Sequence, residues 1–268
     1  MAGRTLKLSA NLSFLFAEFP FAERFARAAR AGFRGVEFMF PFDREVGELR
    51  RLLHEYRLTQ VLYNLPAGDW AAGERGIACI PGREREFREG VDLAIDYARA
   101  LGCSRLNCLA GLTPIGVADD EIRATFAANL RDAARRLSAH GIQLLVEPIN
   151  SRVDMPGFWL DTTAKALATI AAIDDAKLYL QYDLYHAQIM HDDLARTIEA
   201  NIGRIAHFQI ADHPGRHEPG TGEIGYPFLL RLIETLGYQG WIGCEYRPLT
   251  GDSAVSLGWA RDWLSADG

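Results

Sequence analysis

The stretch AARRLSAHGIQLLVEPI, residues 133–149, contains the pattern that decides the fold. An amphipathic segment ends at a glycine, a short apolar run follows, and the run stops at Glu147 before a loop. The same order occurs in ARAARAGFRGVEFMF (26–40), YARALGCSRLNCLAG (97–111) and LIETLGYQGWIGCEY (232–246). A glycine stands where each helix C-cap is expected: Gly32, Gly102, Gly141 and Gly237. The chain therefore alternates helices and strands, although it contains no sequence repeat.

Eight helix and strand pairs fit the chain. The expected strands lie near 6–13, 34–40, 59–64, 105–110, 142–148, 177–183, 205–211 and 241–246, and the expected helices near 21–31, 43–56, 84–101, 119–140, 161–174, 187–202, 226–237 and 253–264. Such alternation gives parallel strands. An open doubly wound sheet is the alternative, but it usually has a glycine-rich phosphate loop after its first strand, and SANLSFLFAEF (9–19) has no glycine. The 268 residues are close to the roughly 250 of an eight-fold barrel, so we predict an α/β protein with one (β/α)8 TIM barrel over 1–268 and its active site at the C-terminal ends of the strands.

The composition is that of an ordinary globular domain. Hydrophobic residues make up 49% and charged residues 24%, and the net charge of −6 comes without a Lys/Arg-rich run, so we expect neither nucleic acid nor an anionic membrane as a partner. No run of eighteen apolar residues occurs, and no signal-peptide pattern is found near the start. The four cysteines form no CxxC pair, which is typical of reduced packing residues. We expect a cytoplasmic protein.

Four oxygen-bearing side chains stand at the ends of successive apolar runs in the second half of the chain. They are Glu147, Asp183, Gln209 and Glu245, in the runs LLVEP, LYLQYD, HFQIAD and WIGCEY. Their separations of 36, 26 and 36 positions correspond to about one strand and helix each, which brings all four to one end of the barrel. Facing carboxylates are costly to bury without a counter-charge, so this end is expected to bind a cation.

Counting by two along each strand tests whether these side chains point the same way. The residues two positions earlier on the four strands, which share the inward face, are Leu145, Gln181, His207 and Gly243, and the residues expected to face the helices are Val146, Tyr182, Phe208, Ile210 and Cys244. All four oxygen-bearing side chains are thus predicted to face the barrel interior.

Each of these residues also has a purely structural explanation when taken alone. Glu147 could end a strand in a salt bridge, Asp183 could cap the helix that follows, and Gln209 could bind neighbouring backbone. Four such positions on successive strands, without a Lys or Arg among them, favour a bound divalent cation instead. An all-oxygen set suits Mg²⁺ or Mn²⁺ better than Zn²⁺. His207, one layer deeper, is expected to support the ligands rather than to bind the ion.

Two further residues are candidates for contact with a ligand. His186 follows Asp183 by three positions, where its imidazole could reach across the barrel mouth or simply face solvent. Arg216, in the loop after the seventh strand, could present a bidentate fork to a carboxylate or hydroxyl group above the cation, or could be an ordinary solvated arginine.

Glu147 and Glu245 come from strands three apart in the ring, so they approach its centre from nearly opposite sides. Two carboxylates that flank a chelated α-hydroxy carbonyl can move a proton from one carbon to its neighbour, and the cation would stabilise the enediolate between them. This arrangement predicts isomerisation or epimerisation without an organic cofactor.

Three loops at the same end of the barrel are long or irregular. They run over 65–82 with Trp70, over 150–160 with Phe158 and Trp159, and over 212–223. Most loops are only solvated connections, but aromatic residues in glycine-containing loops suit a lid over a small polar ligand. Phe14, Trp70 or Phe158 could limit the size of the substrate.

The segments LLVEPIN, QYDLYHAQIM, HFQIADHPGRHEPGTGEIGYP and GYQGWIGCEYRP resemble the hydroxypyruvate isomerase family of the xylose-isomerase-like barrel superfamily. The resemblance implies conversion of hydroxypyruvate to tartronate semialdehyde, with close relatives acting on 2-oxo-tetronates, ketoses or inososes. It implies that Glu147 and Glu245 are both acid/base pair and ligands, that Asp183 and Gln209 only bind the ion, and that His186 and Arg216 contact the substrate. A homo-oligomer is possible in such a family.

Two positions depart from the related ketose epimerases. Gln209 stands where these enzymes usually have His, and Val153 stands where they often have a second Glu, which favours the hydroxypyruvate isomerase branch. Two other function classes remain as alternatives. A metal-dependent nuclease of the same superfamily would need several His ligands and a basic surface, and a barrel used only for binding would not need both glutamates.

Overall fold

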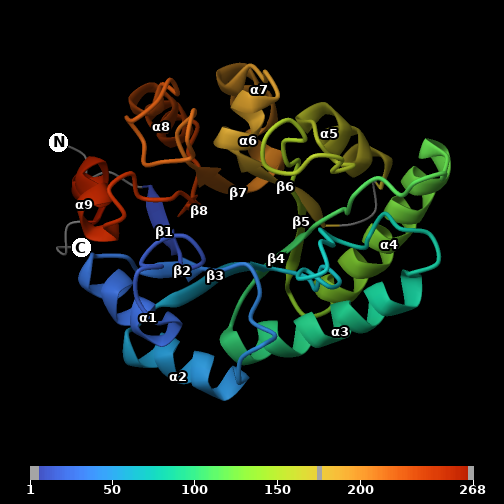
Figure 1. Ribbon diagram of the computed structural model, residues 1–268, viewed down its shortest axis with the longest axis horizontal. Helices are drawn as coiled ribbons and strands as arrows, with labels where there is room; N and C mark the ends of the chain where they lie inside the picture. Colours follow the sequence, from blue (N-terminus) through green and yellow to red (C-terminus); the bar gives the residue numbers. More distant parts are fainter. Residues whose placement is uncertain (1–5, 174–176, 265–268) are drawn as a thin grey trace.

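The computed structural model describes residues 6–173 and 177–264. Eight parallel strands follow one another in sequence order and close into a barrel, because β1 pairs with both β2 and β8. Helices surround the strands (Figure 1). The predicted TIM barrel is therefore confirmed for the described residues; the two ends of the range 1–268, and residue 174 of the helix expected over 161–174, lie outside them.

The elements alternate as expected. The strands are β1 (Lys7–Asn11), β2 (Gly35–Glu37), β3 (Thr59–Asn64), β4 (Arg105–Cys108), β5 (Gln143–Val146), β6 (Leu178–Asp183), β7 (Ile205–Ile210) and β8 (Trp241–Cys244). The α-helices are α1 (Phe21–Arg30), α2 (Val46–Glu55), α3 (Glu84–Leu101), α4 (Asp119–Ser138), α5 (Thr163–Ala172), α6 (Leu184–Ile189), α7 (Leu194–Asn201), α8 (Tyr226–Thr235), α9 (Ser253–Ser256) and α10 (Arg261–Leu264), with 3₁₀ turns at η1 (Ile202–Arg204) and η2 (Leu257–Ala260).

Helix α4 illustrates why these segments form helices around the barrel. Asp119, Asp120 and Glu121 occupy its first turn, where negative charge is favoured by the helix dipole. Its buried side chains recur at helical spacing and pack toward the sheet: Ile122, Phe126, Leu130, Ala133, Ala134 and Leu137. Phe126 is fully buried, so its replacement by Ala would cost about 3–5 kcal/mol.

The predicted alternation of inward and outward residues is confirmed on the strands that carry the site. Leu145 packs with Val61, Leu62 and Ala206 in an inner cluster, separate from the main core to which Val146 belongs. The helix-facing residues Tyr182, Phe208, Ile210 and Cys244 also belong to that main core. Inward and outward side chains are thus divided as the period of two requires at the ends of these strands. The period is interrupted on β3, where Val61 and Leu62 belong to the same cluster next to a shift in the register between β2 and β3.

Several predicted boundaries were wrong. Strand β2 is only Gly35–Glu37 rather than 34–40, and β5 and β8 end one residue before Glu147 and Glu245, because these side chains belong to the polar mouth rather than to the ladder. The single helix expected over 187–202 is two helices, α6 and α7, separated by a turn, and α6 begins at Leu184. The last helix, expected over 253–264, is divided into α9, η2 and α10.

The helices of the described residues were also considered as membrane spans. None of them combines the length and the apolar character that crossing a bilayer requires.

Candidate functional site

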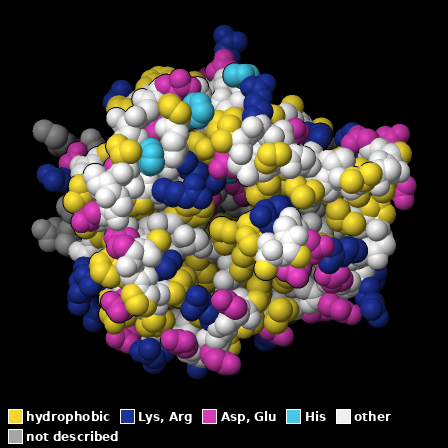
Figure 2. Space-filling model, viewed as in Figure 1, with side chains coloured by type: hydrophobic (Ala, Val, Ile, Leu, Met, Phe, Trp, Pro, Cys, Tyr) yellow, Lys and Arg dark blue, Asp and Glu magenta, His cyan; other side chains and the backbone are white. Residues whose placement is uncertain are grey.

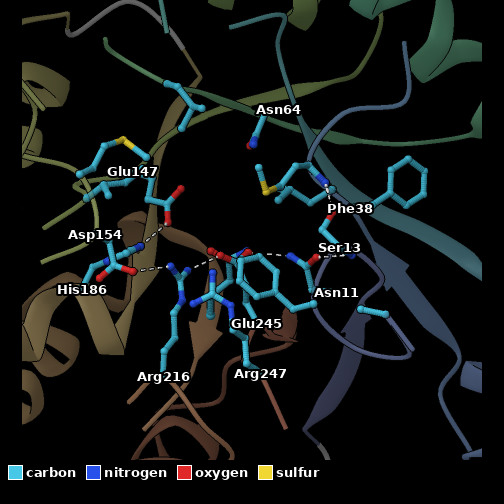
Figure 3. A pocket seen from close by; sticks show the side chains of 18 of the residues that line it. Asn11, Ser13, Phe38, Asn64, Glu147, Asp154, His186, Arg216, Glu245 and Arg247 are labelled. Atoms are coloured by element: carbon cyan, nitrogen blue, oxygen red, sulfur yellow. Dashed lines mark hydrogen bonds and ion pairs between the residues drawn. The ribbon is translucent and has the colours of Figure 1, made fainter. Parts of the chain in front are cut away.

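A cavity of about 620 Å³ opens at the C-terminal ends of the strands. The space-filling view, taken from the same direction as Figure 1, shows a hollow near the middle of this face with basic side chains beside it (Figure 2). Of the residues expected at the site, Glu147, His186, Gln209, Arg216 and Glu245 line the cavity. A close view shows Glu147 and Glu245 approaching it from different sides, with Arg216 between Asp154 and Glu245 (Figure 3).

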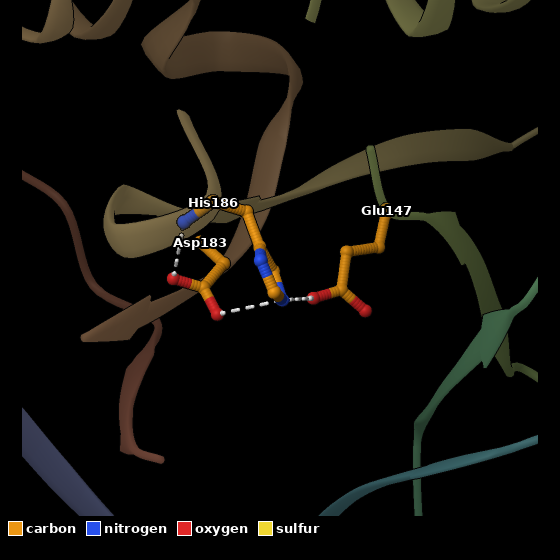
Figure 4. A group of neighbouring side chains, drawn as sticks. All are labelled: Glu147, Asp183 and His186. Carbon is orange, nitrogen blue, oxygen red and sulfur yellow. Dashed lines mark hydrogen bonds and ion pairs between the residues drawn. The ribbon is translucent and has the colours of Figure 1, made fainter. Parts of the chain in front are cut away.

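Glu147, Asp183 and His186 form a compact buried group in which one ligand atom of each lies within 4.8 Å of the others (Figure 4). The Nε2 atom of His186 is 3.9 Å from Glu147 Oε1 and 3.7 Å from Asp183 Oδ2. His186 is 3% exposed, so its imidazole does not lie on the surface. The reach of His186 into the barrel mouth is thus present in the structure.

Asp183 has two separate tasks because its two oxygens face different groups. Oδ1 accepts hydrogen bonds from the backbone N–H groups of Tyr185 (2.8 Å) and His186 (3.4 Å), which makes Asp183 the N-cap of α6. Oδ2 is buried and has no hydrogen-bond partner. A buried carboxylate oxygen is costly to leave unpaired, so Oδ2 is available to a cation.

Glu147 is buried beside other carboxylates. Its Oε2 accepts one hydrogen bond, of 2.9 Å, from the side-chain amide of Asn107. Burial raises the pKa of Glu147 well above its usual range, and the negative charges of Glu245 and Asp183 raise it further. The group of carboxylates is therefore short of positive charge.

Glu245 is held by three donors. Its Oε2 accepts from Asn11 Nδ2 and from Gln209 Nε2, both at 2.6 Å, and its Oε1 accepts from Arg216 at 2.5 Å. Burial nevertheless raises the pKa of Glu245 to about 8; Arg216 opposes this shift and Asp183 adds to it. A carboxyl group with a pKa near neutrality is suited to both accepting and delivering a proton.

The amide of Gln209 is turned so that its nitrogen, not its oxygen, faces the glutamates. Nε2 donates to Glu245 and, at 2.8 Å, to Glu37, while Oε1 accepts from Gln181 Nε2 at 2.6 Å. To act as an oxygen ligand, Gln209 has to turn its amide. Gln181 Oε1 is buried without a partner, so a paired turn of both amides would preserve one hydrogen bond between them.

Glu37 and His207 lie beneath these residues, and Glu37 was missed in the sequence. His207 Nε2 is 2.9 Å from Glu37 Oε2, and both side chains are fully buried. Burial alone would raise the pKa of Glu37, but the charge of His207 and several hydrogen bonds lower it overall. Gly243 leaves the space for this carboxylate, because a Cβ there would lie 2.3 Å from Glu37 Oε1. Glu37 could have been found in the sequence, because it is a charged residue at an inward-facing position of the otherwise apolar second strand.

The hydrogen bonds of Asn150 determine which nitrogen of His186 carries the proton. Asn150 Oδ1 accepts from the backbone N–H groups of Val153 and Asp154, so its amide nitrogen faces His186 Nδ1 at 2.7 Å. Nδ1 is then the acceptor, and Nε2–H points toward the carboxylates. Burial lowers the pKa of His186 to about 4, so the imidazole is neutral at neutral pH. The neutral ring thus offers a donor, rather than a lone pair, to the cavity.

Arg216 is almost completely buried, unlike an ordinary solvated arginine. One terminal nitrogen contacts Asp154 Oδ1 at 3.0 Å, and the other contacts Glu245 Oε1 at 2.5 Å and lies 3.9 Å from Asp183 Oδ2. Its Nε is buried without a partner. Asp154, which also accepts from Tyr185, was missed because it lies in a loop without a periodic pattern.

The loop aromatics divide into two groups. Trp70 and Phe14 line the cavity, as expected of residues that could limit substrate size. Phe158 and Trp159 are each 2% exposed and belong to the core, so neither ring lines the cavity and the expectation that Phe158 could limit substrate size was wrong. Trp159 Nε1 donates to Asp119 Oδ1 at 2.8 Å, which ties the loop to the start of α4.

These observations test whether the site suits a divalent cation. Three buried carboxylates converge, the pKa values of Glu147 and Glu245 are raised, and Asp183 Oδ2 lacks a hydrogen-bond partner. Arg216 compensates part of this charge through its contacts with Asp183 and Glu245. The oxygen-rich donor set therefore fits a hard cation.

Comparison with known proteins connects this geometry to a family. Residues 25–264 match the model of the xylose isomerase-like TIM barrel family. The chain is 55% identical over 245 residues to a protein of Escherichia coli (strain K12) named hydroxypyruvate isomerase, covering 91% of this chain and 95% of that protein. It is 46% identical over 258 residues to a protein of Cupriavidus necator named 2-oxo-tetronate isomerase, covering 96% and 98%.

A solved structure shares both the fold and much of the sequence. A Brucella melitensis protein described as an AP endonuclease, family 2, superposes with a TM-score of 0.92 at 48% identity, covering 95% of this chain and 97% of that one. The curated relatives that match nearly their whole length to this chain are isomerases by name. This chain is an enzyme of the isomerase kind and belongs to the xylose isomerase-like TIM barrel family.

Proposed function

We propose that this protein is a metal-dependent isomerase of small α-hydroxy carbonyl acids, and that it converts hydroxypyruvate to tartronate semialdehyde. The observation that carries this proposal is the pair of buried glutamates, Glu147 and Glu245, whose raised pKa values suit proton transfer across one cavity. The 55% identity to a protein named hydroxypyruvate isomerase supports the choice of substrate.

The reaction needs only proton movements. In hydroxypyruvate, one glutamate carboxylate accepts a proton from C3, and the hydroxyl on C3 loses its proton as that carbon becomes an aldehyde. C2 gains one proton on carbon and one on its oxygen, so one C–H and one O–H bond break while one of each forms. Glu147 and Glu245 take the two sides of this transfer, and no external oxidant or organic cofactor is required.

Glu147, Asp183, Gln209 and Glu245 would hold an Mg²⁺ or Mn²⁺ ion, with Gln209 turning its amide oxygen toward it. Such a cation supplies positive charge that polarises the substrate oxygens and favours removal of the neighbouring carbon-bound proton. His207 fixes Glu37 from below, and Glu37 accepts a hydrogen bond from Gln209 Nε2 in the orientation seen here, which is given up when the amide turns.

His186 and Arg216 contact the substrate in this proposal. The neutral His186 donates its Nε2–H to a substrate oxygen, which agrees with the hydrogen bond that Asn150 makes to Nδ1. Arg216 lowers the pKa of Glu245 by ion pairing, against the larger effect of burial, and its unpartnered Nε is the donor left for the substrate.

A 2-oxo-tetronate is the alternative substrate, because a relative of 46% identity is named for that activity. Its extra carbon adds little to a cavity of about 620 Å³. Epimerisation of a ketose or inosose would use the same carboxylates. A nuclease is disfavoured because the group of side chains that could hold a metal ion, among the described residues, contains one histidine beside two carboxylates.

The test follows the carbon-bound hydrogen by NMR. The protein is incubated in deuterated water with Mg²⁺ or Mn²⁺ and either hydroxypyruvate or a 2-oxo-tetronate, and conversion should be accompanied by deuterium at the carbon that gains a proton, unless the same proton is carried over. Chelation of the divalent ion should stop turnover, and its return should restore it. Inertness toward both acids, or full activity without a divalent ion, would contradict the proposal.

A further inference from the structure

A substrate with a carboxylate brings a negative charge into a cavity that already contains several carboxylates. A charge-bearing donor outside the acid/base pair is therefore needed to bind that end of the molecule. Three arginines line the cavity: Arg75, Arg216 and Arg247. They differ in what their guanidinium groups already contact.

Arg216 is committed to the protein. Its two terminal nitrogens contact Asp154 and Glu245, so the bidentate edge of the guanidinium is occupied. Releasing it to bind a substrate carboxylate would leave Glu245 without its cation in a buried position, which is costly. Its unpartnered Nε can make one hydrogen bond, but not the paired contact that a carboxylate favours.

Arg247, in contrast to Arg216, has a guanidinium group that is not paired with a carboxylate of the described residues. It follows Glu245 by two residues, is exposed at the cavity, and makes no ion pair with a carboxylate in the part of the chain that the structure describes. Its backbone is fixed on both sides, since its N–H donates to Arg216 O at 2.9 Å and its carbonyl contacts His217 Nδ1 at 2.8 Å. The guanidinium carbon of Arg247 lies 5.6 Å from the centre of the Phe14 ring, and the guanidinium carbon of Arg216 lies 4.9 Å from the same ring centre. In Figure 3 its side chain extends into the cavity.

Arg75 is a weaker candidate because it serves its own loop. Its Nη1 donates to the carbonyls of Trp70 (3.1 Å) and Glu74 (2.7 Å), and its guanidinium carbon stacks 4.2 Å from the centre of the Trp70 ring. These contacts hold the chain after β3 in its shape. They explain the residue without a ligand.

We infer that Arg247 is the residue that binds the substrate carboxylate, and so determines the preference for hydroxy-keto acids over uncharged sugars of the same length. This inference rests on the proposed function and deepens it. Arg247 is a specificity residue: it binds one end of the substrate and takes no part in the proton transfer between Glu147 and Glu245.

The test compares hydroxypyruvate with dihydroxyacetone, in which a hydroxymethyl group replaces the carboxylate. In Arg247→Gln the KM for hydroxypyruvate should rise about 10- to 100-fold with kcat within about threefold, because a charge-assisted hydrogen-bonded contact is lost from both ground and transition states. Turnover of dihydroxyacetone should change less than about threefold. Arg247→Lys should recover part of the affinity. Arg85→Gln removes an equal charge from an exposed site, 3.8 Å from Glu89, and should match wild type.

Calorimetry with glycerate in the presence of Mg²⁺ separates this inference from the proposed function. A wild type that turns over neither hydroxypyruvate nor a 2-oxo-tetronate would end the proposed function, but loss of glycerate binding in Arg247→Gln would still support the carboxylate contact. Unchanged KM and unchanged glycerate binding in Arg247→Gln would overturn it. The inference would also be overturned if Arg75→Gln, and not Arg247→Gln, raised the KM for hydroxypyruvate and lost glycerate binding.

Discussion

The side chains of Glu147 and Glu245 are buried in a place where each opposes the ionisation of the other. Burial and neighbouring carboxylates raise both pKa values, and the donors Asn107, Asn11 and Arg216 only partly compensate. Carboxyl groups in such surroundings are common at catalytic sites because their protonation can change near neutral pH. The repulsion between these buried carboxylates therefore raises their pKa values at the place where the proposed proton transfer occurs.

Replacing either glutamate by the isosteric glutamine tests their role as proton carriers. Glu147→Gln and Glu245→Gln should each lower kcat for hydroxypyruvate by about 10²–10⁴-fold, because an amide cannot accept the carbon-bound proton. Thermal unfolding in metal-free buffer should not fall for Glu147→Gln, since this change removes a repelled buried carboxyl group. It should fall for Glu245→Gln, because the buried Arg216 loses one of its ion-pair partners. Glu89→Gln alters an exposed glutamate and should leave kcat unchanged. An activity within threefold of wild type in both site variants would contradict the acid/base assignment.

The positions of these two glutamates could be predicted from the sequence because each ends an apolar run at a regular spacing. Asn11, Asn107 and Asp154 could not, although all three contact the charged centre. Their short polar side chains have no charge pattern or period of their own, and their partners lie far away in sequence. Asn11 and Glu245, for example, are 234 positions apart.

At the scale of elements, α6 connects local folding to the site. The helix is only Leu184–Ile189, and its N-cap, Asp183, points one oxygen at the backbone and the other toward His186 and Arg216. A single helix over 187–202 was expected because its apolar spacing continues through the turn at residues 190–193. The earlier start of α6 is what brings His186 into its first turn and toward Glu147.

Two substitutions at Asp183 separate its tasks. Asp183→Asn keeps an oxygen that can cap α6, whereas Asp183→Ala removes the cap, and both remove the charge. Asp183→Ala should therefore be less stable than Asp183→Asn by about 1 kcal/mol in urea unfolding without metal. Both variants should lose most turnover. Equal stability of the two variants would show that the hydrogen bonds to Tyr185 and His186 do not stabilise α6.

At the scale of the whole molecule, the barrel can be predicted from local sequence patterns more readily than the loops at its mouth. Alternating helices and strands follow from local patterns, and closure needs only that β8 meet β1, which a chain of eight such units achieves. The burial of Phe158 and Trp159, in contrast, depends on contacts with α4 and with the start of α5 that no local pattern encodes. The loops over the barrel are therefore where prediction from sequence is weakest.

Cation binding should be visible in the stability of the whole molecule. An ion that binds only the folded state at 100 times its dissociation constant adds about 2.7 kcal/mol to the free energy of unfolding. For a chain of this size that corresponds to a rise in Tm of roughly 5–10 °C. Thermal unfolding followed by fluorescence, with Mn²⁺ or Mg²⁺ against a sodium salt of equal ionic strength, measures the shift directly.

The matched variant makes this experiment specific to the site. In Asp183→Asn the unpartnered carboxylate oxygen is replaced while the cap of α6 remains, so the rise in Tm should largely disappear although the fold is unchanged. An equal rise in wild type and variant would mean that the ion stabilises the protein elsewhere. No rise in wild type would mean that Glu147, Asp183 and Glu245 are compensated by Arg216 and their hydrogen-bond donors alone.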